Sequence, residues 1–557
     1  MHRTSIVILL AAVASTASLS HAHRSAEPSL IPEVEAALEA AGTPEADGPA
    51  DFEAAPSPAQ RVAFQGLPDQ LHRQIDSWFE GHGTRRVHVQ LDRPMFRPGD
   101  TVWLKSYAVS TAGFEGDGGD GVLYELLDPR GTVVSSKRVQ HRDGMATNDF
   151  ALASDAPGGR WILRATLATG EIEERPFVVA SYTPPRIHKD LEFVREAYSA
   201  GDRVEALVEL TGPDGEPLAH HAVRVMLQVD GQAVHETTAR TDDTGAVLAS
   251  AALPGQLSSS DGLLTVLVDD GGVTESISRS VPIVIADLAL SFFPEGGDLV
   301  TGLPSRVYFA ATNRHGEPAD VQGVIEDDDG RIVADFRSVH DGLGRFAFTP
   351  QPGRKYQARL DIGGEIVDVR LPEALDSGCV LHSFDDVHSE HDAVRVGVQC
   401  TDAREVVVTG TLREQTVDTA AVRVEEGRAA VVHLDAPPEL AHQQGAVRVT
   451  VFDGDLHPLA ERLVYRHAGD DLGIEITPRR ETYGPRDEVV LDVRTTTPDG
   501  APVPAEIALS VVDDAVLGLA DDEEGHMLSR LYLEPDLVES PDDPAWYFDD
   551  EEALAAR

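Results

Sequence analysis

Short runs in which apolar and polar residues alternate cover most of this chain. Val87, Val89 and Leu91 alternate with polar neighbours, and Val102 and Leu104 do so shortly afterwards. A period of two places successive side chains on opposite faces of a strand, so each such strand has one buried face. Glycine and proline, at 48 and 35 residues, separate the runs, while aromatic residues make up only 6% of the chain. The pattern predicts an all-β protein with many turns.

A strand, a turn and a second strand recur along the sequence. In residues 97–100, Pro98 fixes its own φ and Gly99 tolerates a positive φ, as a type II turn requires. Two later segments, about 100 and a further 285 or so residues along, repeat this pattern, and both continue into a second shared turn at 214–217 and 499–502. The matching positions are Phe96, Gly99, Asp100 and Val102; Tyr198, Gly201, Asp202 and Val204; and Tyr483, Asp487 and Val489.

The spacing of the copies predicts a row of domains of similar size. A chain of 557 residues is too long for one core and fits about five β-domains of roughly 100 residues. We assign 1–22 to a signal peptide, 23–63 to a disordered tether rich in Ala, Pro and Glu, 64–84 to a short amphipathic helix, 85–182, 183–286, 287–373, 374–468 and 469–520 to β-sandwiches, the last partial or complete, and 521–557 to an acidic tail.

The N-terminus predicts export. Arg3 precedes the apolar run 6–14, and Ser20 and Ala22 are small residues at the positions that a signal peptidase reads. No cysteine lies near this site, so a lipid anchor is not indicated, and no later stretch reaches the ~18 apolar residues of a membrane span. We therefore expect a protein of the periplasm, the cell surface or the extracellular space.

The charge of the chain narrows the range of partners. A net charge of −49 repels nucleic acid and anionic membrane surfaces, so neither is expected to bind. The acidic residues are spread over turns and tails, which favours a role in solubility.

The only cysteines are Cys379 and Cys400. In an oxidising compartment two thiols at this separation most simply form one disulfide, which contributes about 3 kcal/mol by the loop-entropy argument. They lie at the ends of two predicted strands that could lie side by side.

Two glycine- and acid-rich segments are candidate ligand sites. Residues 116–121 satisfy GxGxxG, but a strand follows where a dinucleotide site needs a helix, so a hairpin loop is favoured. Glu115, Asp117 and Asp120 offer oxygen ligands for calcium without the full loop signature. Residues 327–330 are interpreted as a solvated hairpin turn.

The densest group of metal-ligating residue types lies between the two cysteines. Imidazole and carboxylate suit a transition metal, but the HExxH spacing of metalloproteases is absent and a polar connecting loop is favoured. There is also no GxSxG and no phosphate-binding loop. We expect no metal, no cofactor and no catalytic residues. The group comprises His382, Asp385, Asp386, His388, Glu390 and His391.

Three segments resemble the macroglobulin domains of the alpha-2-macroglobulin and complement family. They are LDRPMFRPGDTVWLK at 91–105, ALSVVDDAVL at 508–517 and FFPEGGDLVTGLPSRV at 292–307, the last of which is similar to the bacterial branch. The likeness covers about 85–520. It implies tandem immunoglobulin- or fibronectin-like β-sandwiches and an involvement in endopeptidase inhibition.

The covalent trapping chemistry of that family cannot be transferred to this sequence. Its thioester joins a Cys to a Gln three residues on, whereas His382 and Ala403 stand at those positions after Cys379 and Cys400. We therefore expect a non-catalytic form that lacks the thioester domain and acts through protein contacts, with proteases as implied partners. A cell-surface structural or adhesive spacer is the alternative, and a metal-dependent hydrolase using the 382–391 group is a second one.

Overall fold

The computed structural model describes residues 66–537 with interruptions, together with 6–11, 57–58, 60–61 and 548. The interruptions are 117–120, 182–186, 196–197, 199, 213–214, 230, 256, 258–261, 271–272, 284–287, 314–315, 317, 341, 363–364, 386, 390–392, 442, 468–471, 481–482, 484–486, 498 and 514–525.

The first β-sandwich (sandwich 1) has a three-stranded sheet, β4-β6-β9, and a five-stranded sheet, β5-β11-β10-β7-β8. Alternate residues such as Val102 and Leu104 face the core between the sheets, as the pattern predicts. Its strands are β4 (Arg85–Leu91), β5 (Met95–Phe96), β6 (Thr101–Ser110), β7 (Gly121–Leu127), β8 (Val133–Gln140), β9 (Met145–Ala151), β10 (Gly159–Leu167) and β11 (Ile172–Val179).

The second β-sandwich (sandwich 2) repeats this plan with sheets β12-β13-β16 and β15-β14-β17-β18. Its core includes Tyr198 and Val204, the counterparts of Phe96 and Val102. Its strands are β12 (His188–Phe193), β13 (Arg203–Thr211), β14 (Ala222–Val229), β15 (Gln232–Arg240), β16 (Ala246–Ala252), β17 (Gly262–Asp270) and β18 (Val273–Ser280).

The third β-sandwich (sandwich 3) is one continuous seven-stranded sheet of order β19-β20-β23-β22-β21-β24-β25 that β22 carries from one layer to the other. Phe309, Phe336 and Phe346 pack edge to face or tilted in its core. Its strands are β19 (Leu288–Pro294), β20 (Ser305–Asn313), β21 (Gln322–Asp327), β22 (Ile332–His340), β23 (Leu343–Phe348), β24 (Tyr356–Ile362) and β25 (Glu365–Arg370).

The fourth β-sandwich (sandwich 4) has sheets β2-β31-β28-β26 and β27-β33-β32-β29-β30-β3. Its elements are β26 (Cys379–Ser383), β27 (Val387–Ser389), β28 (Val394–Cys400), β29 (Arg404–Leu412), β30 (Gln415–Val424), β31 (Ala430–Leu434), the 3-10 turn η1 (Pro438–Leu440), β32 (Gly445–Phe452) and β33 (Pro458–His467), joined by β2 (Ser57–Pro58) and β3 (Gln60–Arg61).

The prediction of disorder throughout 23–63 is wrong for β2 and β3. These short strands add to the edge strands β31 and β30, one on each sheet of sandwich 4. A sheet edge presents unpaired N–H and C=O groups to any extended backbone. Composition measures only the apolar area that a segment can bury, so it does not register this pairing.

The predicted helix is present as α2 (Leu67–His82), and it packs on sandwich 4. Leu71 contacts Val407 of β29 and Ala421 of β30 on the outer face of the six-stranded sheet. Because the helix covers this face, β29 is buried on both sides, which accounts for its unbroken apolar run Val406, Val407 and Val408.

The last part of the chain contains the hairpin β34 (Gly473–Pro478) and β35 (Leu491–Thr496), and the strand β36 (Ala508–Asp513). Strand β1 (Ile6–Ala11) pairs antiparallel with β36. It lies within the proposed signal peptide, whose cleavage stays a prediction. Among the described residues, no helix has the length and apolarity needed to cross a membrane.

The acidic tail assigned to 521–557 contains a short ordered segment. Helix α4 (Met527–Tyr532) buries Met527, Leu528 and Leu531 and is followed by the 3-10 turn η3 (Glu534–Asp536). Arg530 of α4 forms ion pairs with Glu173 of sandwich 1 and with Glu534. One helical turn is too short to be stable alone, and it is stabilised here by packing against other elements.

Each copy of the repeated turn also has an arginine three residues before the aromatic residue. In each copy the guanidinium lies over that ring and pairs with the turn aspartate, so one side chain holds strand and turn together. The ring distances are 4.8 Å for Arg93 and Phe96, 5.2 Å for Arg195 and Tyr198, and 5.7 Å for Arg480 and Tyr483; the ion-pair distances are 3.1 Å for Arg93 and Asp100, 3.3 Å for Arg195 and Asp202, and 3.6 Å for Arg480 and Asp487.

Backbone hydrogen bonds of the turn also repeat between sandwiches 1 and 2. The glycine of each copy has a positive φ, 89° at Gly99 and 83° at Gly201. Gly99 N donates to Ala153 O at 3.0 Å and Leu152 N to Asp100 O at 2.8 Å; Gly201 N donates to Pro254 O at 2.8 Å and Leu253 N to Asp202 O at 2.8 Å. The sequence repeat therefore corresponds to a structural repeat.

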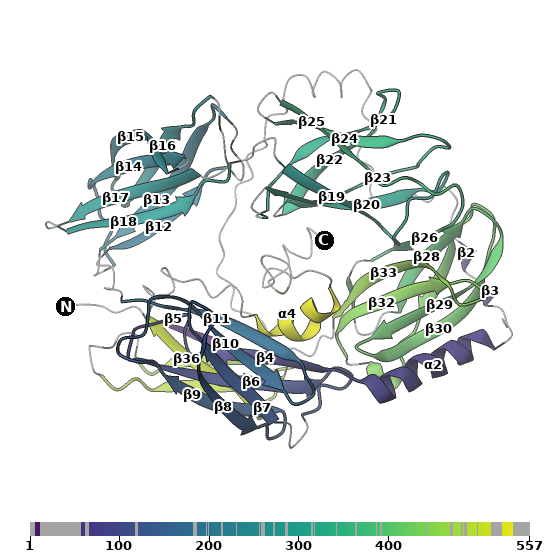
Figure 1. Ribbon diagram of the computed structural model, residues 1–557, viewed down its shortest axis with the longest axis horizontal. Coiled ribbons are helices and arrows are strands. Elements are labelled where there is room, and N and C mark those ends of the chain that lie inside the picture. The colour runs from purple at the N-terminus through teal and green to yellow at the C-terminus, as the bar shows by residue number, and fades with distance from the viewer. Residues whose placement is uncertain are drawn as a thin grey trace.

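Sandwiches 1 to 4 are arranged around a common centre, with α4 between the first and the fourth (Figure 1). Sandwich 4 closes on sandwich 1 through side chains of the β29–β30 turn. The Glu414 carboxylate accepts from Thr84 N at 2.9 Å, and Gln415 Nε2 donates to Ala112 O at 2.5 Å. The predicted fold class, an all-β chain of tandem β-sandwiches, is confirmed, and sandwich 4 contacts sandwiches 1 and 3 instead of standing in an extended row.

Replacing Gly201 by alanine tests the repeated turn. A Cβ there would meet no atom nearer than Gly255 Cα at 3.8 Å, so the cost is left-handed backbone strain of about 1–2 kcal/mol. We expect amide exchange in β13 and β16 to accelerate about 5- to 30-fold. Gly255→Ala is the matched control, because its Cβ would meet nothing within 4 Å and no positive φ is involved. Unchanged exchange in Gly201→Ala would contradict the role of the turn.

Candidate functional site

Cys379 and Cys400 form a disulfide inside sandwich 4. They stand directly opposite each other in the antiparallel pair β26–β28, with a Cα–Cα distance of 4.0 Å. Both are buried among the valines of the sandwich core. The bridge ties together two strands that β27 separates along the chain. Neither sulfur is therefore available as a nucleophile in this state.

His382 lies in a buried junction between sandwiches 3 and 4. Its Nδ1 is 2.9 Å from Glu295 Oε2 and its Nε2 is 3.0 Å from Pro304 O. Both ring nitrogens therefore face acceptor oxygens of sandwich 3.

The remaining members of the 382–391 group are placed as follows. Asp385 pairs with Arg395, so it does not join His382 in a ligand set. Asp386, Glu390 and His391 lie outside the described residues, and the side chain of His388 in β27 is not described either. Nothing in the described geometry supports the metal-dependent hydrolase alternative.

Glu295 is the central group of the junction between sandwiches 3 and 4. Its side chain is fully buried. Oε1 accepts from Ser383 N at 3.0 Å and lies 3.6 Å from Arg306 Nη1 and 3.3 Å from Arg462 Nε. Desolvation alone would raise the pKa of Glu295, but the hydrogen bond to His382 and the two arginines outweigh it and lower the pKa below its ordinary value.

The loop 294–298 explains how Glu295 reaches sandwich 4. Gly296 has a φ of 88° and a virtual Cβ would lie only 3.0 Å from Leu381 N, so only glycine fits. The same residue bridges Glu461 of β33. Sequence reasoning identified the PEGG segment as a family feature but missed the role of Glu295. A lone carboxylate between an apolar strand and two glycines was the available signal.

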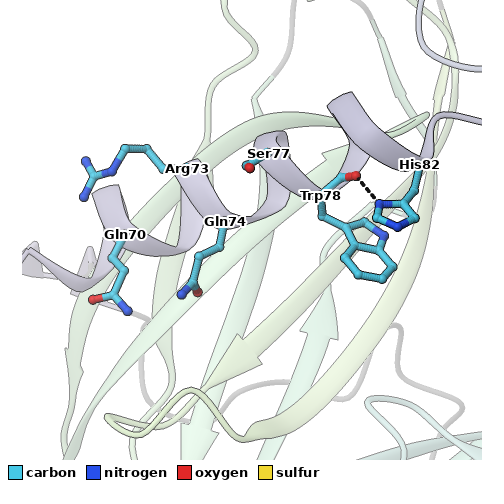
Figure 2. A pocket seen from close by; sticks show the side chains of 6 residues that line it. All are labelled: Gln70, Arg73, Gln74, Ser77, Trp78 and His82. Atoms are coloured by element: carbon cyan, nitrogen blue, oxygen red, sulfur yellow. Dashed lines mark hydrogen bonds between the residues drawn. The ribbon is translucent and has the colours of Figure 1, made fainter.

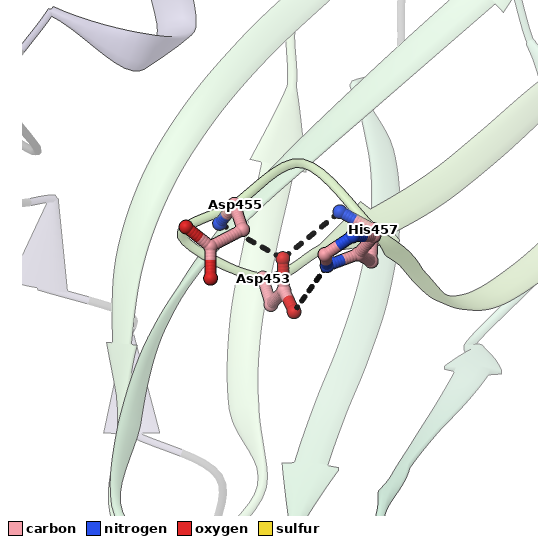
Figure 3. A group of neighbouring side chains, drawn as sticks. All are labelled: Asp453, Asp455 and His457. Atoms are coloured by element: carbon pink, nitrogen blue, oxygen red, sulfur yellow. Dashed lines mark hydrogen bonds and ion pairs between the residues drawn. The ribbon is translucent and has the colours of Figure 1, made fainter.

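Asp453, Asp455 and His457 form the tip of the hairpin between β32 and β33 (Figure 3). Asp453 Oδ1 accepts from the backbone N–H groups of Asp455 and His457, both at 2.9 Å, and Oδ2 lies 3.3 Å from His457 Nδ1. Desolvation would raise the pKa of Asp453, and these hydrogen bonds lower it overall. The cluster is an Asx-type turn whose carboxylate is used locally.

Two further acidic loops, at 327–330 and 115–120, are candidate ligand sites from the sequence. Asp327 Oδ1 accepts from the N–H groups of Asp329 and Arg331, which is a hairpin turn as interpreted. Asp117 and Asp120 lie outside the described residues, so the calcium hypothesis at 115–120 stays untested.

The outer face of α2 is a candidate protein-contact surface (Figure 2). Trp78 is 59% exposed and stacks on His82 with ring centroids 4.0 Å apart. Gln70, Arg73 and Gln74 line the same shallow groove along the helix. An exposed tryptophan ringed by polar residues is typical of protein interfaces. We call this set the α2 face.

Comparison with known proteins identifies one domain and a set of relatives. Residues 86–179 match the MG2 domain family. The chain is 24% identical over 489 residues to an alpha-2-macroglobulin of Ralstonia nicotianae, covering 77% of this chain and 30% of that protein. It is 22% identical over 304 residues to an alpha-2-macroglobulin of Thermotoga maritima, covering 51% of this chain and 19% of that protein.

Among solved structures, the trypsin-activated alpha-2-macroglobulin of Escherichia coli matches 75% of this chain and 33% of that chain, at 16% identity and a TM-score of 0.44. The chain thus spans less than a third of the length of the curated relatives that it matches.

Removing the disulfide should destabilise sandwich 4. Closing a loop of 21 residues stabilises by about 3 kcal/mol, so the variant Cys379→Ala/Cys400→Ala should lose roughly that amount. The measurement is amide exchange in β26 and β28, with β13 and β16 of sandwich 2 as internal control. Wild-type protein under reducing conditions should show the same acceleration. Equal protection with and without the bridge would refute this.

Neutralising Glu295 should weaken the junction of sandwiches 3 and 4. Glu295→Gln leaves Arg306 and Arg462 without their shared buried counter-charge, which costs about 3 kcal/mol or more. We expect a lower urea midpoint. The exposed carboxylate Glu373, paired with Lys355, is the control, and Glu373→Gln should keep the wild-type midpoint. A variant at position 295 as stable as wild type would overturn this account.

The same carboxylate predicts a pH dependence. Because the folded-state pKa of Glu295 is lowered, its contribution is fully present above the unfolded value of 4.5 and is lost as the pH falls towards the folded value. The stability difference between wild type and Glu295→Gln should therefore be constant from pH 7 to about 5 and shrink at lower pH. A difference that grows on acidification would show the opposite sign and contradict the assignment.

Proposed function

Because this chain is a relative of the bacterial alpha-2-macroglobulins, we propose that it is an exported, non-catalytic protein that acts by binding other proteins, endopeptidases among them. The observation that carries the proposal is the MG2 match at 86–179, joined to an alignment with a bacterial alpha-2-macroglobulin over 77% of the chain. The apolar N-terminal run and the small residues before position 23 support export.

The mechanism proposed is steric and without covalent capture. Cys379 and Cys400, the only cysteines of the sequence, are joined in the core of sandwich 4, which supports binding without a thioester. A protein with tandem sandwiches closed on one another presents a broad surface that can cover part of a protease. Large substrates would then be blocked while small ones still reach the active site.

A non-catalytic role agrees with how the buried charged groups are used. Glu295 binds two arginines and a histidine, Glu173 pairs with Arg530, and Lys189 pairs with Glu275. Each of these groups fixes the position of one element against another. Such structural pairs perturb charged groups without forming a catalytic arrangement.

The α2 face is the surface we propose for contact with the protease. It lies on the outside of sandwich 4, and its exposed tryptophan belongs to the residue types that carry most binding energy at interfaces. The face also carries Arg73, a positive charge in a chain whose net charge is −49.

The alternative of a structural or adhesive spacer has one supporting observation, the long N-terminal segment before α2. A spacer gains reach from sandwiches placed end to end. The closed arrangement in Figure 1 shortens the molecule instead, which favours the binding role.

Incubation with endopeptidases tests the proposal. We expect a bound protease to lose activity on a large protein substrate while retaining activity on a small peptide substrate. Trp78→Ala should weaken binding of the protease, and with it this inhibition, about tenfold or more. Trp103→Ala is the matched control, since Trp103 has the same 59% exposure on β6. If every endopeptidase tried keeps its full activity on the large substrate, the inhibitor role is refuted. If both variants lose inhibition equally, the assignment of the α2 face is refuted.

A further inference from the structure

The junction where sandwich 4 meets sandwich 1 encloses a cavity of about 290 Å³ with an excess of positive charge. Four arginines line it, from β4, the β29–β30 turn and β32, against two carboxylates, and one of the four, Arg448, also pairs with Glu461 outside the lining. In a chain of net charge −49, a local excess of cations needs a physical reason. The charged lining residues are Arg85, Arg86, Arg413, Arg448, Glu414 and Asp536.

Arg413 is the least compensated of these charges. It is only 5% exposed, and its guanidinium lies 4.0 Å from the centroid of Phe114. Nη2 donates to Gln443 Oε1 at 2.7 Å, but Nε and Nη1 are buried without a hydrogen-bond acceptor in the described part of the chain. Burial, reinforced by the positive charge of Arg86, lowers the pKa of Arg413 to about 10. The residue nevertheless stays charged at neutral pH.

Nearby carboxylates are already engaged. Asp536 Oδ2 accepts from Arg86 Nη2 at 2.8 Å. Glu414 accepts from Thr84 N and Thr84 Oγ1, and it belongs to the contact that closes sandwich 4 on sandwich 1. Asp536 therefore pairs directly with Arg86 and acts on Arg413 only as a nearby negative charge, while the acceptor that Arg413 bonds is the neutral Gln443. Leaving a buried guanidinium in this state costs several kcal/mol unless an anion approaches it.

The position of Arg413 is built into the backbone. Arg413 and Glu414 form the two-residue turn between β29 and β30, with φ of 45° and 69°, values that non-glycine residues rarely adopt. The turn thereby places the Arg413 guanidinium beside Phe114 and the Glu414 carboxylate beside Thr84. A strained turn that carries a poorly paired, buried arginine indicates a functional constraint.

We propose that this cavity (the junction cavity) binds a small oxyanion, and that the bound anion braces sandwich 1, sandwich 4 and η3, the turn that follows α4, against one another. Arginine is suited to oxyanions because its planar donors can bond two oxygens at once. The overall negative charge does not prevent binding, since charges beyond about 8 Å are screened at physiological salt while the cavity arginines lie in direct reach. Phosphate, sulfate and the carboxylate of a small organic acid share the required chemistry.

Inorganic phosphate is the probe for the full-length protein. We expect phosphate at millimolar concentration to raise the melting temperature, to broaden the ³¹P resonance of the free anion, and to slow amide exchange in α4 and η3. Chloride at the same ionic strength should do none of these. Sulfate and malonate, run as parallel arms, distinguish an inorganic anion from an organic carboxylate as the preferred ligand.

Arg413→Met should weaken phosphate binding at least tenfold, and Arg448→Met, on the half-exposed rim, should weaken it several-fold without affecting the fold. Arg354→Met, whose arginine pairs with Asp328 in sandwich 3, is the matched control and should respond to phosphate as wild type does. Because Arg448→Met removes only a rim charge, it keeps the test decisive if Arg413→Met does not fold. An equal response of all four proteins, or an equal effect of chloride, would overturn the proposal.

Discussion

The contact between the first and the fourth sandwich is the constraint on which the rest of the architecture depends. It consists of a tight two-residue turn whose Glu414 caps the backbone of Thr84 and whose Arg413 is enclosed beside Phe114. Helix α2 sits on the same sheet of sandwich 4 and leads directly into β4 of sandwich 1. The covalent connection and the tertiary contact between sandwiches 1 and 4 therefore lie close together. A linker of a few residues is then enough to fix the relative position of the two sandwiches.

Each sandwich has its own apolar core, and the fully buried carboxylate Glu295 lies at a junction between two of them. The arginine that stacks on an aromatic ring and pairs with an aspartate is exposed enough to contribute little energy, but it fixes the geometry of the turn in all three copies. Glu295 differs, because it is fully buried and would be costly if any partner were lost. Charge placed at junctions makes domain arrangement specific, whereas apolar packing alone would tolerate sliding.

The sequence predicted the fold class, the repeat and the helix because these follow from periodicity and turn chemistry. Val102 and Val204 alternate with polar neighbours, and Gly99 and Gly201 need a positive φ, so the signal lies within a few residues. The contacts of Glu295 and the strands β2 and β3 could not be predicted in this way. They join residues far apart in the chain, and a backbone pair or a buried ion pair leaves no periodic trace.

The candidate metal group at 382–391 illustrates why residue type alone misleads. Histidine and carboxylate are ligands for metals, but they are also the groups that neutralise a buried arginine cluster, and the two uses need different surroundings. His382 lies opposite Glu295, which already faces Arg306 and Arg462, so an added cation at that point would be repelled by two positive charges. The junction cavity presents the converse case: its arginines outnumber its carboxylates, and the same Coulomb argument favours an anion there. The sign of the uncompensated charge, more than the identity of any one residue, decides what each site can hold.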